Sequence, residues 1–221
     1  MGASFFNPAE AAAVRGFARI AKGSEAAMDE SAILDEFRAS EALLEGHFLL
    51  SSGRHSEHYL QCARVLMDPK RAARLAEALA GKLAGEIRQR IEAVVSPAMG
   101  GVIIGHEMGR ALGVPAMFVE RPTRTFELRR GFALAPGAKV LMVEDVVTTG
   151  LSSREAIKAI EAAGGEVIAA AALVDRSNGS VDLGVPFTPL IAIDFPTYDA
   201  AELPPHLAGT QAVKPGSRAA A

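Results

Sequence analysis

Residues 140–153 read VLMVEDVVTTGLSS and place two carboxylates, two threonines and a glycine between an apolar run and a serine-rich stretch. The apolar run predicts a buried strand, and the residues from Leu151 onward predict a helix. Thr148, Thr149 and Gly150 would lie between the two and offer hydroxyls and consecutive backbone N–H groups. A loop of this kind at a helix N-terminus binds a phosphate dianion through oriented amides and the positive end of the helix dipole.

Glu144 and Asp145, at the end of the same strand, must have a different role, because carboxylates repel phosphate. We interpret them as acceptors for vicinal sugar hydroxyls, so that acids and loop together predict a ribose 5-phosphate site. The alternative is Mg²⁺ ligation by the acids, as on a Walker-B strand, but no GxxxxGK[ST] motif occurs in the chain. A purely structural alternative is two surface acids followed by an ordinary helix cap.

The surrounding sequence predicts an α/β fold with a mainly parallel open sheet and helices on both faces. Its apolar strands alternate with helices and do not alternate in polarity, which is typical of parallel strands buried on both sides. The expected strands cover residues 93–97, 114–120, 139–145, 166–176 and 188–195. The expected helices cover residues 33–45, 68–90, 101–113 and 152–165, the second starting at the N-cap Asp68 and Pro69.

Three further segments complete the expected organisation. Residues 47–63 predict a hairpin around a Ser-Gly turn, and the polar, basic residues 121–137 predict a loop with a ribbon at 126–134. Residues 197–221 are rich in Pro, Gly and Ala and are expected to end disordered. Four glycines spaced four apart predict a helix that lies very close to the sheet, namely Gly101, Gly105, Gly109 and Gly113.

Composition excludes several classes of protein. The 221 residues suffice for one large domain, and a net charge of −3 provides no global attraction for nucleic acid or acidic lipid. No run approaches roughly 18 apolar residues, and the N-terminus lacks the order of a secretory signal. Cys62 is the single cysteine, which excludes an internal disulfide and fits a reducing cytoplasm. We therefore expect a cytoplasmic protein without membrane or nucleic-acid partners.

The run VLMVEDVVTTG resembles, without a gap, the phosphoribosyl-diphosphate signature of the type I phosphoribosyltransferases: four hydrophobics, two acids, two small apolar residues, Thr, a small residue and Gly. The resemblance implies that family's fold and the transfer of ribose 5-phosphate from phosphoribosyl diphosphate (PRPP) to a nitrogen base. It implies Mg²⁺ carried on PRPP, with no protein side chain as an assigned metal ligand. Asp145 and Arg121 are the implied catalytic residues. The implied PRPP-binding residues are Arg121, Glu144, Asp145, Val146, Val147, Thr148, Thr149, Gly150, Leu151 and Ser152, and the implied diphosphate loop is Ala98, Met99, Gly100 and Gly101.

Residues 46–61, GHFLLSSGRHSEHYLQ, resemble the N-terminal hood of the family members that use orotate, where an xSGxxSxxY stretch lines the pyrimidine pocket. The Asp175-Arg176 pair and the closing KPGSR resemble further features of those members. Orotate is a planar carboxylate that an arginine can bind in a bidentate way. The resemblance, which extends over about residues 45–218, thus implies orotate binding by Thr148 and Arg176. The implied product is orotidine 5′-monophosphate, on the route to UMP.

The sequence differs from the family at positions where its members commonly carry a cationic side chain. Gly100 and Ser51 stand where several members carry lysine, and the lid loop keeps Arg121 but has other residues at the remaining cation positions, namely Pro122, Thr125 and Glu127. One of the remaining arginines of the loop would then supply the positive charge that the lid lacks, namely Arg124, Arg129 or Arg130.

The expected organisation is an N-terminal segment of uncertain order (1–30), a helix and hood hairpin (31–66), a phosphoribosyltransferase core (67–200) and a tail that partly returns to the hood (201–221). The resemblance also implies a homodimer whose lid loop crosses the interface. Two alternatives stay open: a purine phosphoribosyltransferase, which would cover its base differently, and a PRPP-sensing regulator without transferase activity. The second usually binds nucleic acid, which the net charge and the lack of a DNA-binding module disfavour.

Overall fold

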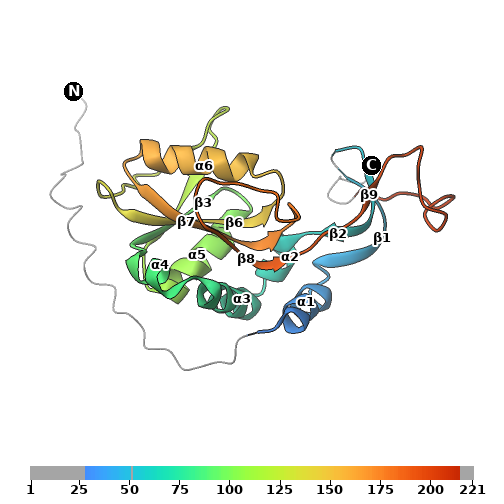
Figure 1. Ribbon diagram of the computed structural model, residues 1–221, viewed down its shortest axis with the longest axis horizontal. Coiled ribbons are helices and arrows are strands. Elements are labelled where there is room, and N and C mark those ends of the chain that lie inside the picture. The colour runs from blue at the N-terminus through green and yellow to red at the C-terminus, as the bar shows by residue number, and fades with distance from the viewer. Residues whose placement is uncertain (1–27, 51, 215–221) are drawn as a thin grey trace.

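The computed structural model describes residues 28–50 and 52–214, which form a core and a smaller hood beside it (Figure 1). The core sheet has six strands in the order β5-β4-β3-β6-β7-β8. Five of them are parallel: β3 (Ala93–Pro97), β4 (Ala116–Glu120), β6 (Lys139–Val147), β7 (Glu166–Asp175) and β8 (Phe187–Ala192). The two-residue β5 (Glu127–Leu128) pairs antiparallel with β4 at the edge. The expected mainly parallel sheet is confirmed.

Helices cover both faces of this sheet. One face packs against α6 (Leu151–Ala162), and the other against α3 (Pro69–Lys82), α4 (Gly85–Arg90) and α5 (Gly101–Leu112) (Figure 1). Successive residues of β6 point to opposite faces: Leu141 belongs to the apolar cluster beneath α3 and α5, and Met142 to the cluster beneath α6. The same alternation governs the carboxylates at the end of β6.

Two of the expected helices have different limits. The first, expected over residues 33–45, is α1 (Glu30–Ala39), because Glu41 adopts a positive φ of 52° and turns the chain into β1 (Leu43–Leu49). The second, expected over 68–90, is split into α3 and α4, since Leu83 has an extended backbone. Its predicted start is confirmed: the Asp68 carboxylate accepts hydrogen bonds from the backbone N–H of Lys70 and Arg71.

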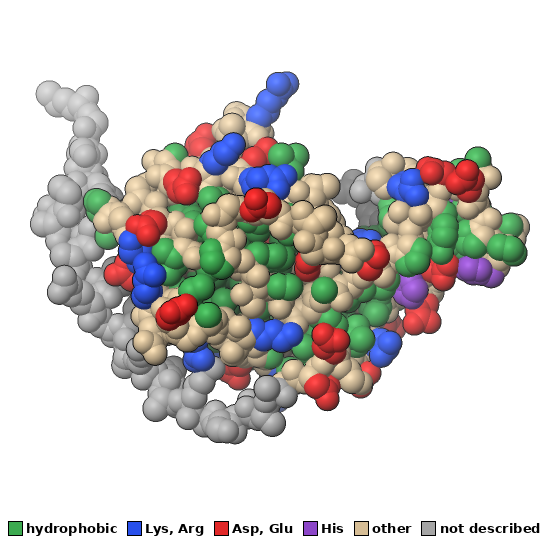
Figure 2. Space-filling model, viewed as in Figure 1, with side chains coloured by type: hydrophobic (Ala, Val, Ile, Leu, Met, Phe, Trp, Pro, Cys, Tyr) green, Lys and Arg blue, Asp and Glu red, His purple; other side chains and the backbone are tan. Residues whose placement is uncertain are grey.

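The hood is a three-stranded sheet built from distant parts of the chain. β1 pairs antiparallel with β2 (His55–Leu60), which confirms the expected hairpin, and β9 (Thr197–Tyr198) adds to the other edge of β2. The short helix α2 (Cys62–Leu66) leads from β2 into the core. From the tail, Val213 accepts a hydrogen bond from the Leu49 N–H at 2.9 Å and donates one to the His47 carbonyl at 2.8 Å. Histidine side chains gather on this part of the surface (purple in Figure 2).

The spaced glycines of α5 bring that helix against the sheet, as predicted. A Cβ on Gly105 would lie 2.5 Å from the Ser96 Oγ, and one on Gly109 would lie 2.7 Å from the Ala116 Cβ. Gly113 has a positive φ of 70° and ends the helix. Within the described residues, no helix is long and apolar enough to cross a membrane.

Some of the predictions made from the sequence concern residues that the structure does not describe. These are the order of residues 1–27, the role of Ser51, and the closing segment beyond Lys214, including the expected disorder at the end of the chain.

Candidate active site

The junction between β6 and α6 opens onto a cavity of about 480 Å³. The loop and first helical turn, residues 148–152, are called the phosphate loop below. The cavity is lined by residues from three segments of the chain: Ala98; Arg121 and Phe126; and Glu144, Val146, Thr148, Thr149, Gly150, Leu151, Ser152 and Ser153. Phe126 and Ser153 were not among the residues expected at the site. Of the expected residues, Met99, Gly100, Gly101, Asp145, Val147 and Arg176 do not line this cavity.

Gly150 allows the phosphate loop to turn into the helix. Its φ of 71° lies in the left-handed region, which residues with a Cβ rarely adopt. A Cβ at this position would also lie 2.4 Å from Val181 Cγ2 and 2.9 Å from Leu183 Cδ2. Both the backbone conformation and the available space therefore require glycine.

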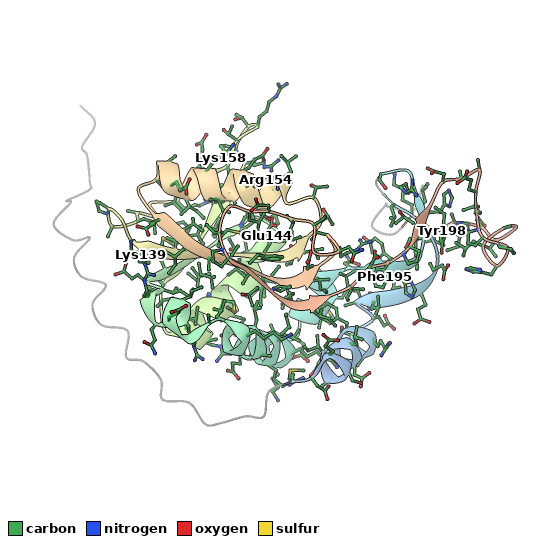
Figure 3. The ribbon with its side chains drawn as sticks, viewed as in Figure 1. Lys139, Glu144, Arg154, Lys158, Phe195 and Tyr198 are labelled. Atoms are coloured by element: carbon green, nitrogen blue, oxygen red, sulfur yellow. The ribbon has the colours of Figure 1, made fainter. Side chains whose placement is uncertain are left out.

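Arg154, on the first turn of α6, braces the phosphate loop. Its Nη2 donates to the Thr149 carbonyl at 2.9 Å and its Nη1 donates to the Asp182 carbonyl at 3.1 Å. Because C=O and N–H point in opposite directions in a trans peptide, this bond turns the N–H of Gly150 away from Arg154. Figure 3 labels Arg154 on α6 and Glu144 on β6, the two elements that the phosphate loop joins. The residue was not predicted as part of the site, although its position four residues after Gly150 placed it on the first turn.

Glu144 is buried at the cavity wall, with a relative exposure of 6%. The Ser153 hydroxyl donates a hydrogen bond to its carboxylate, which ties the end of β6 to the start of α6. Burial raises the pKa of Glu144, and the charge of Asp145 adds to the rise. The hydroxyls of Ser153 and Ser152 and the guanidinium of Arg121 act in the opposite direction but do not cancel it. The carboxylate is thus held by the helix start and also borders the cavity.

Asp145 points to the other side of β6, toward the loop between β3 and α5. A Cβ on Gly100 would lie only 2.5 Å from Asp145 Oδ2, so the carboxylate occupies the space that the missing side chain leaves free. Burial raises the pKa of Asp145, and backbone N–H groups at Val146 and at Asp145 itself partly offset this effect. The two acids therefore lie on opposite faces of the strand and contact different groups, although the charge of Asp145 still contributes to the raised pKa of Glu144.

The loop between β3 and α5 runs beside the Asp145 carboxylate. Its Ala98–Met99 peptide bond is cis, and the Ala98 N–H donates to the Val119 carbonyl at 2.8 Å. Gly101 begins α5 so close to β6 that a Cβ there would lie 3.0 Å from the Val143 carbonyl oxygen. The loop thus brings backbone groups to the end of the strand that carries Asp145.

Arg121 is held at the cavity by two contacts. Its guanidinium forms an ion pair with Glu155 of α6, and its Cζ lies 4.1 Å from the ring centroid of Phe126. Two of the arginines considered for the lid, Arg129 and Arg130, both pair with Glu120. Among the described residues, Arg124 forms no ion pair, and it is exposed on the loop between β4 and β5.

Arg176 directly follows β7 and is anchored beside the phosphate loop, since its backbone N–H donates to the Val147 carbonyl at 2.8 Å. Burial lowers the pKa of its guanidinium, and the nearby Asp194 opposes that shift. The side-chain Nε is buried and has no hydrogen-bond partner among the residues that the structure describes.

A mainly parallel sheet with a glycine-containing loop at the β6–α6 junction and a hood beside the core fits the fold of the phosphoribosyltransferases. The family model described as "Phosphoribosyl transferase domain" matches residues 65–184, more than half of the chain.

Comparison with known proteins identifies the branch of that family. A protein of Novosphingobium aromaticivorans named orotate phosphoribosyltransferase is 81% identical over 192 residues, covering 87% of this chain and 99% of that protein. One of the same name from Sphingopyxis alaskensis is 76% identical over 195 residues, covering 88% and 100%. The crystal structure of orotate phosphoribosyltransferase from Aeropyrum pernix matches with a TM-score of 0.64 and 28% identity, covering 73% of this chain and 93% of that one. The chain belongs to the orotate phosphoribosyltransferase family.

Proposed function

We propose that this protein transfers ribose 5-phosphate from PRPP to orotate, giving orotidine 5′-monophosphate and diphosphate in de novo pyrimidine biosynthesis. The observation that carries the proposal is the β6–α6 junction, where a glycine-containing loop, a helix N-terminus and a buried carboxylate border one cavity. The choice of orotate rests on the name shared by relatives that match nearly their whole length.

The 5-phosphate of PRPP would bind in the phosphate loop. The first N–H groups of α6 have no partner within the helix, and the hydroxyls of Thr148, Thr149 and Ser152 lie at the same cavity. The ribose would then lie toward the end of β6, where Glu144 and Val146 line the cavity and Asp145 and Val147 complete the strand. In this arrangement the carboxylates accept hydrogen bonds from ribose hydroxyls.

In the reaction the bond between C1′ and the diphosphate oxygen breaks, and its electron pair leaves with the diphosphate. A ring N–H of orotate gives up its proton to the solvent, and the nitrogen bonds to C1′ with the electron pair that this releases. The ribose ring becomes cationic on the way, so no nucleophilic side chain is needed. The protein supplies position and charge stabilisation. We assign Asp145 the role of favouring the cationic ring, because a partly buried carboxylate acts more strongly there than it would in water.

The departing diphosphate would meet the loop formed by Ala98, Met99, Gly100 and Gly101, and the guanidinium of Arg121. Phosphoribosyltransferases generally use Mg²⁺ with PRPP, and bound Mg²⁺ would neutralise part of the charge on the leaving group. Within the described residues, no group of three or more His, Cys, Asp or Glu side chains is gathered for a metal ion. Asp145 lies against Gly100 of the diphosphate loop, so its carboxylate would be close to an ion that PRPP carries there.

Thr148 and Arg176 would bind orotate. The carboxylate of orotate suits the two parallel N–H donors of a guanidinium, and Arg176 begins beside Val147, one residue before Thr148. Burial around Arg176 strengthens such a pair by removing competing water.

We further propose a cytoplasmic homodimer in which the basic loop after Arg121 closes over the site of the neighbouring subunit. Closure would exclude water, which would otherwise hydrolyse PRPP. Of the three candidate arginines, Arg124 is best suited to contact diphosphate, since Glu120 already pairs with Arg129 and Arg130.

The test is a mixture of the protein, PRPP, Mg²⁺ and orotate, in which the loss of orotate absorbance is followed. Turnover is expected with orotate and not with adenine, hypoxanthine or guanine. Turnover with a purine instead would establish the purine alternative. Tight PRPP binding without turnover of any base would support the PRPP-sensing regulator and contradict the proposal.

A further inference from the structure

Phe195 lies at the junction between the core and the hood (Figure 3). It follows β8, where the preceding Ile193 N–H donates to the Asp175 carbonyl at 2.8 Å. On its other side, the Pro196 carbonyl accepts a hydrogen bond from the Ser56 hydroxyl of β2 at 3.3 Å. Phe195 is therefore fixed from both sides, by the strand that precedes Arg176 and by the hood.

Two polar side chains contact the Phe195 ring. The Arg176 Cζ lies over the ring, 5.4 Å from its centroid. The imidazole of His58, from β2, is stacked on it, with the centroids 4.5 Å apart and the planes inclined by 10°. We call these three residues the Phe195 cluster. It joins one residue from the carboxyl end of β7, one from the chain after β8 and one from the hood.

The Phe195 cluster holds two buried nitrogens without partners. They are His58 Nδ1 and Arg176 Nε, and no other buried side-chain nitrogen or oxygen of the described residues lacks a hydrogen bond. A buried polar atom without a hydrogen bond destabilises the folded protein. Two such atoms on residues that share one ring, in a protein that otherwise satisfies its buried polar side chains, indicate a place where a ligand supplies the missing partners.

The geometry also determines which edges stay available. A cation–π contact uses no hydrogen bond of the guanidinium, so its N–H donors can still bind a carboxylate. A stacked imidazole likewise keeps its ring nitrogens at the edge. The cluster thus restricts the many rotamers of Arg176 without using its hydrogen-bonding capacity.

We infer that Phe195 is a positioning residue that orients Arg176 toward the base, and that His58 is a second polar contact for the same planar, anionic, oxygen-bearing heterocycle. This inference rests on the proposed function and extends it, because it names what determines base specificity on the hood side. The pyrimidine would lie between the core and the hood, against the edges of the Phe195 cluster.

The test compares Phe195→Leu, which keeps an apolar side chain but removes the ring, with Phe195→Tyr, which keeps the ring. For Phe195→Leu the KM for orotate should rise about tenfold, the size expected from a desolvated cation–π contact, while the KM for PRPP stays within about twofold of native. Phe195→Tyr should restore most of the native KM for orotate.

His58→Phe provides an independent test, because it preserves a flat ring for stacking and removes only the nitrogens. The KM for orotate should rise about fivefold, as for the loss of one hydrogen bond, with little change in the melting temperature. If Phe195→Leu does not fold, an unchanged KM for orotate in His58→Phe still overturns the inference, because it removes the assigned contact between His58 and the base.

A merely structural role for the cluster would give a different pattern. Equal increases of both KM values, or a Phe195→Tyr variant as impaired as Phe195→Leu, would overturn the inference while orotate turnover by the native protein upheld the proposed function. Absence of orotate turnover in the native protein would overturn the proposed function, and this inference with it.

Discussion

The phosphate loop and the Phe195 cluster are built in different ways. The conformation of the phosphate loop is fixed by Gly150, by the Arg154 hydrogen bonds and by the Ser153 bond to Glu144. In the Phe195 cluster, two buried side-chain nitrogens remain without partners in the described residues. In the proposed function, the loop would bind a phosphate that is the same in every substrate of this class, so a preorganised backbone site would serve it. The base differs between members, and side chains that can change without altering the fold would recognise it.

The largest effect should come from Gly150→Ala, which would damage the phosphate loop itself. Alanine meets both an unfavourable φ of 71° and a contact of 2.4 Å with Val181, so kcat/KM for PRPP should fall more than about 100-fold and stability by about 2–4 kcal/mol. Steady-state kinetics and thermal melting measure the two effects.

Gly164→Ala is the matched control for that change. Gly164 has a φ of 91°, but nothing lies within 4 Å of the position of its Cβ. It shares the backbone strain without the crowding at the phosphate loop, so it should lower the melting temperature and leave the KM for PRPP near native. Equal kinetic losses in both variants would mean that general destabilisation, and not the loop, explains Gly150→Ala.

Asp145→Asn should lower the activity of the protein without lowering its stability. Losing the charge should lower kcat/KM about 10- to 100-fold, as for a hydrogen bond to an ionised group. Because burial raises the pKa of Asp145, ionisation disfavours the folded state above the ordinary aspartate pKa. The asparagine variant should therefore be at least as stable as native near neutral pH.

The pH dependence provides the check on Asp145→Asn. The stability difference should shrink as the pH falls below the ordinary aspartate pKa, where the native side chain is protonated in both states. Denaturant unfolding at neutral and acidic pH measures it. The exposed Asp35→Asn is the control and should change neither activity nor stability appreciably. A large loss of stability at neutral pH for Asp145→Asn would show that this carboxylate has a structural role.

Arg176→Ala tests the base side of the comparison. Removal of its bidentate donors should raise the KM for orotate about 30-fold and leave PRPP affinity nearly unchanged, as judged by steady-state kinetics and by titration with PRPP. The buried Nε without a partner disappears with the side chain, so the variant should also remain folded. A parallel loss of PRPP affinity would contradict the placement of the base.

The phosphate loop could be predicted from the sequence because its chemistry is local. Residues 144–152 form one uninterrupted strand, loop and helix start, and all of the loop and helix-start residues named from the motif line the cavity. The alternation along β6 was also available from the sequence, yet only the packing of Gly100 against Asp145 reveals how differently the two acids are surrounded.

The Phe195 cluster could not be predicted because its members are brought together by tertiary structure. His58, Arg176 and Phe195 come from two sheets, and β9, which fixes the hood beside the core, is only two residues long. A Phe following an apolar strand is usually part of the core, and no local pattern distinguishes it. The useful signal would have been its position just past the carboxyl end of the strand next to β7, where ligands bind in parallel sheets.

Among the substitutions at Gly150, Asp145, Arg176 and Arg154, the smallest effect should come from Arg154→Met, which removes the brace of the phosphate loop and keeps the length of the side chain. The Thr149 carbonyl loses its hydrogen bond from a charged donor, so the loop should sample orientations in which the Gly150 N–H no longer points to the phosphate. The KM for PRPP should rise about tenfold, with the KM for orotate unchanged. Arg38→Met, which removes an exposed arginine that pairs with Asp35 on α1, is the control and should have little effect. Arg154→Met should thus affect PRPP and Arg176→Ala should affect orotate, although each variant removes one arginine near the ends of neighbouring strands. If Arg154→Met raised the KM for orotate instead, the division of labour between backbone and side-chain recognition would not hold.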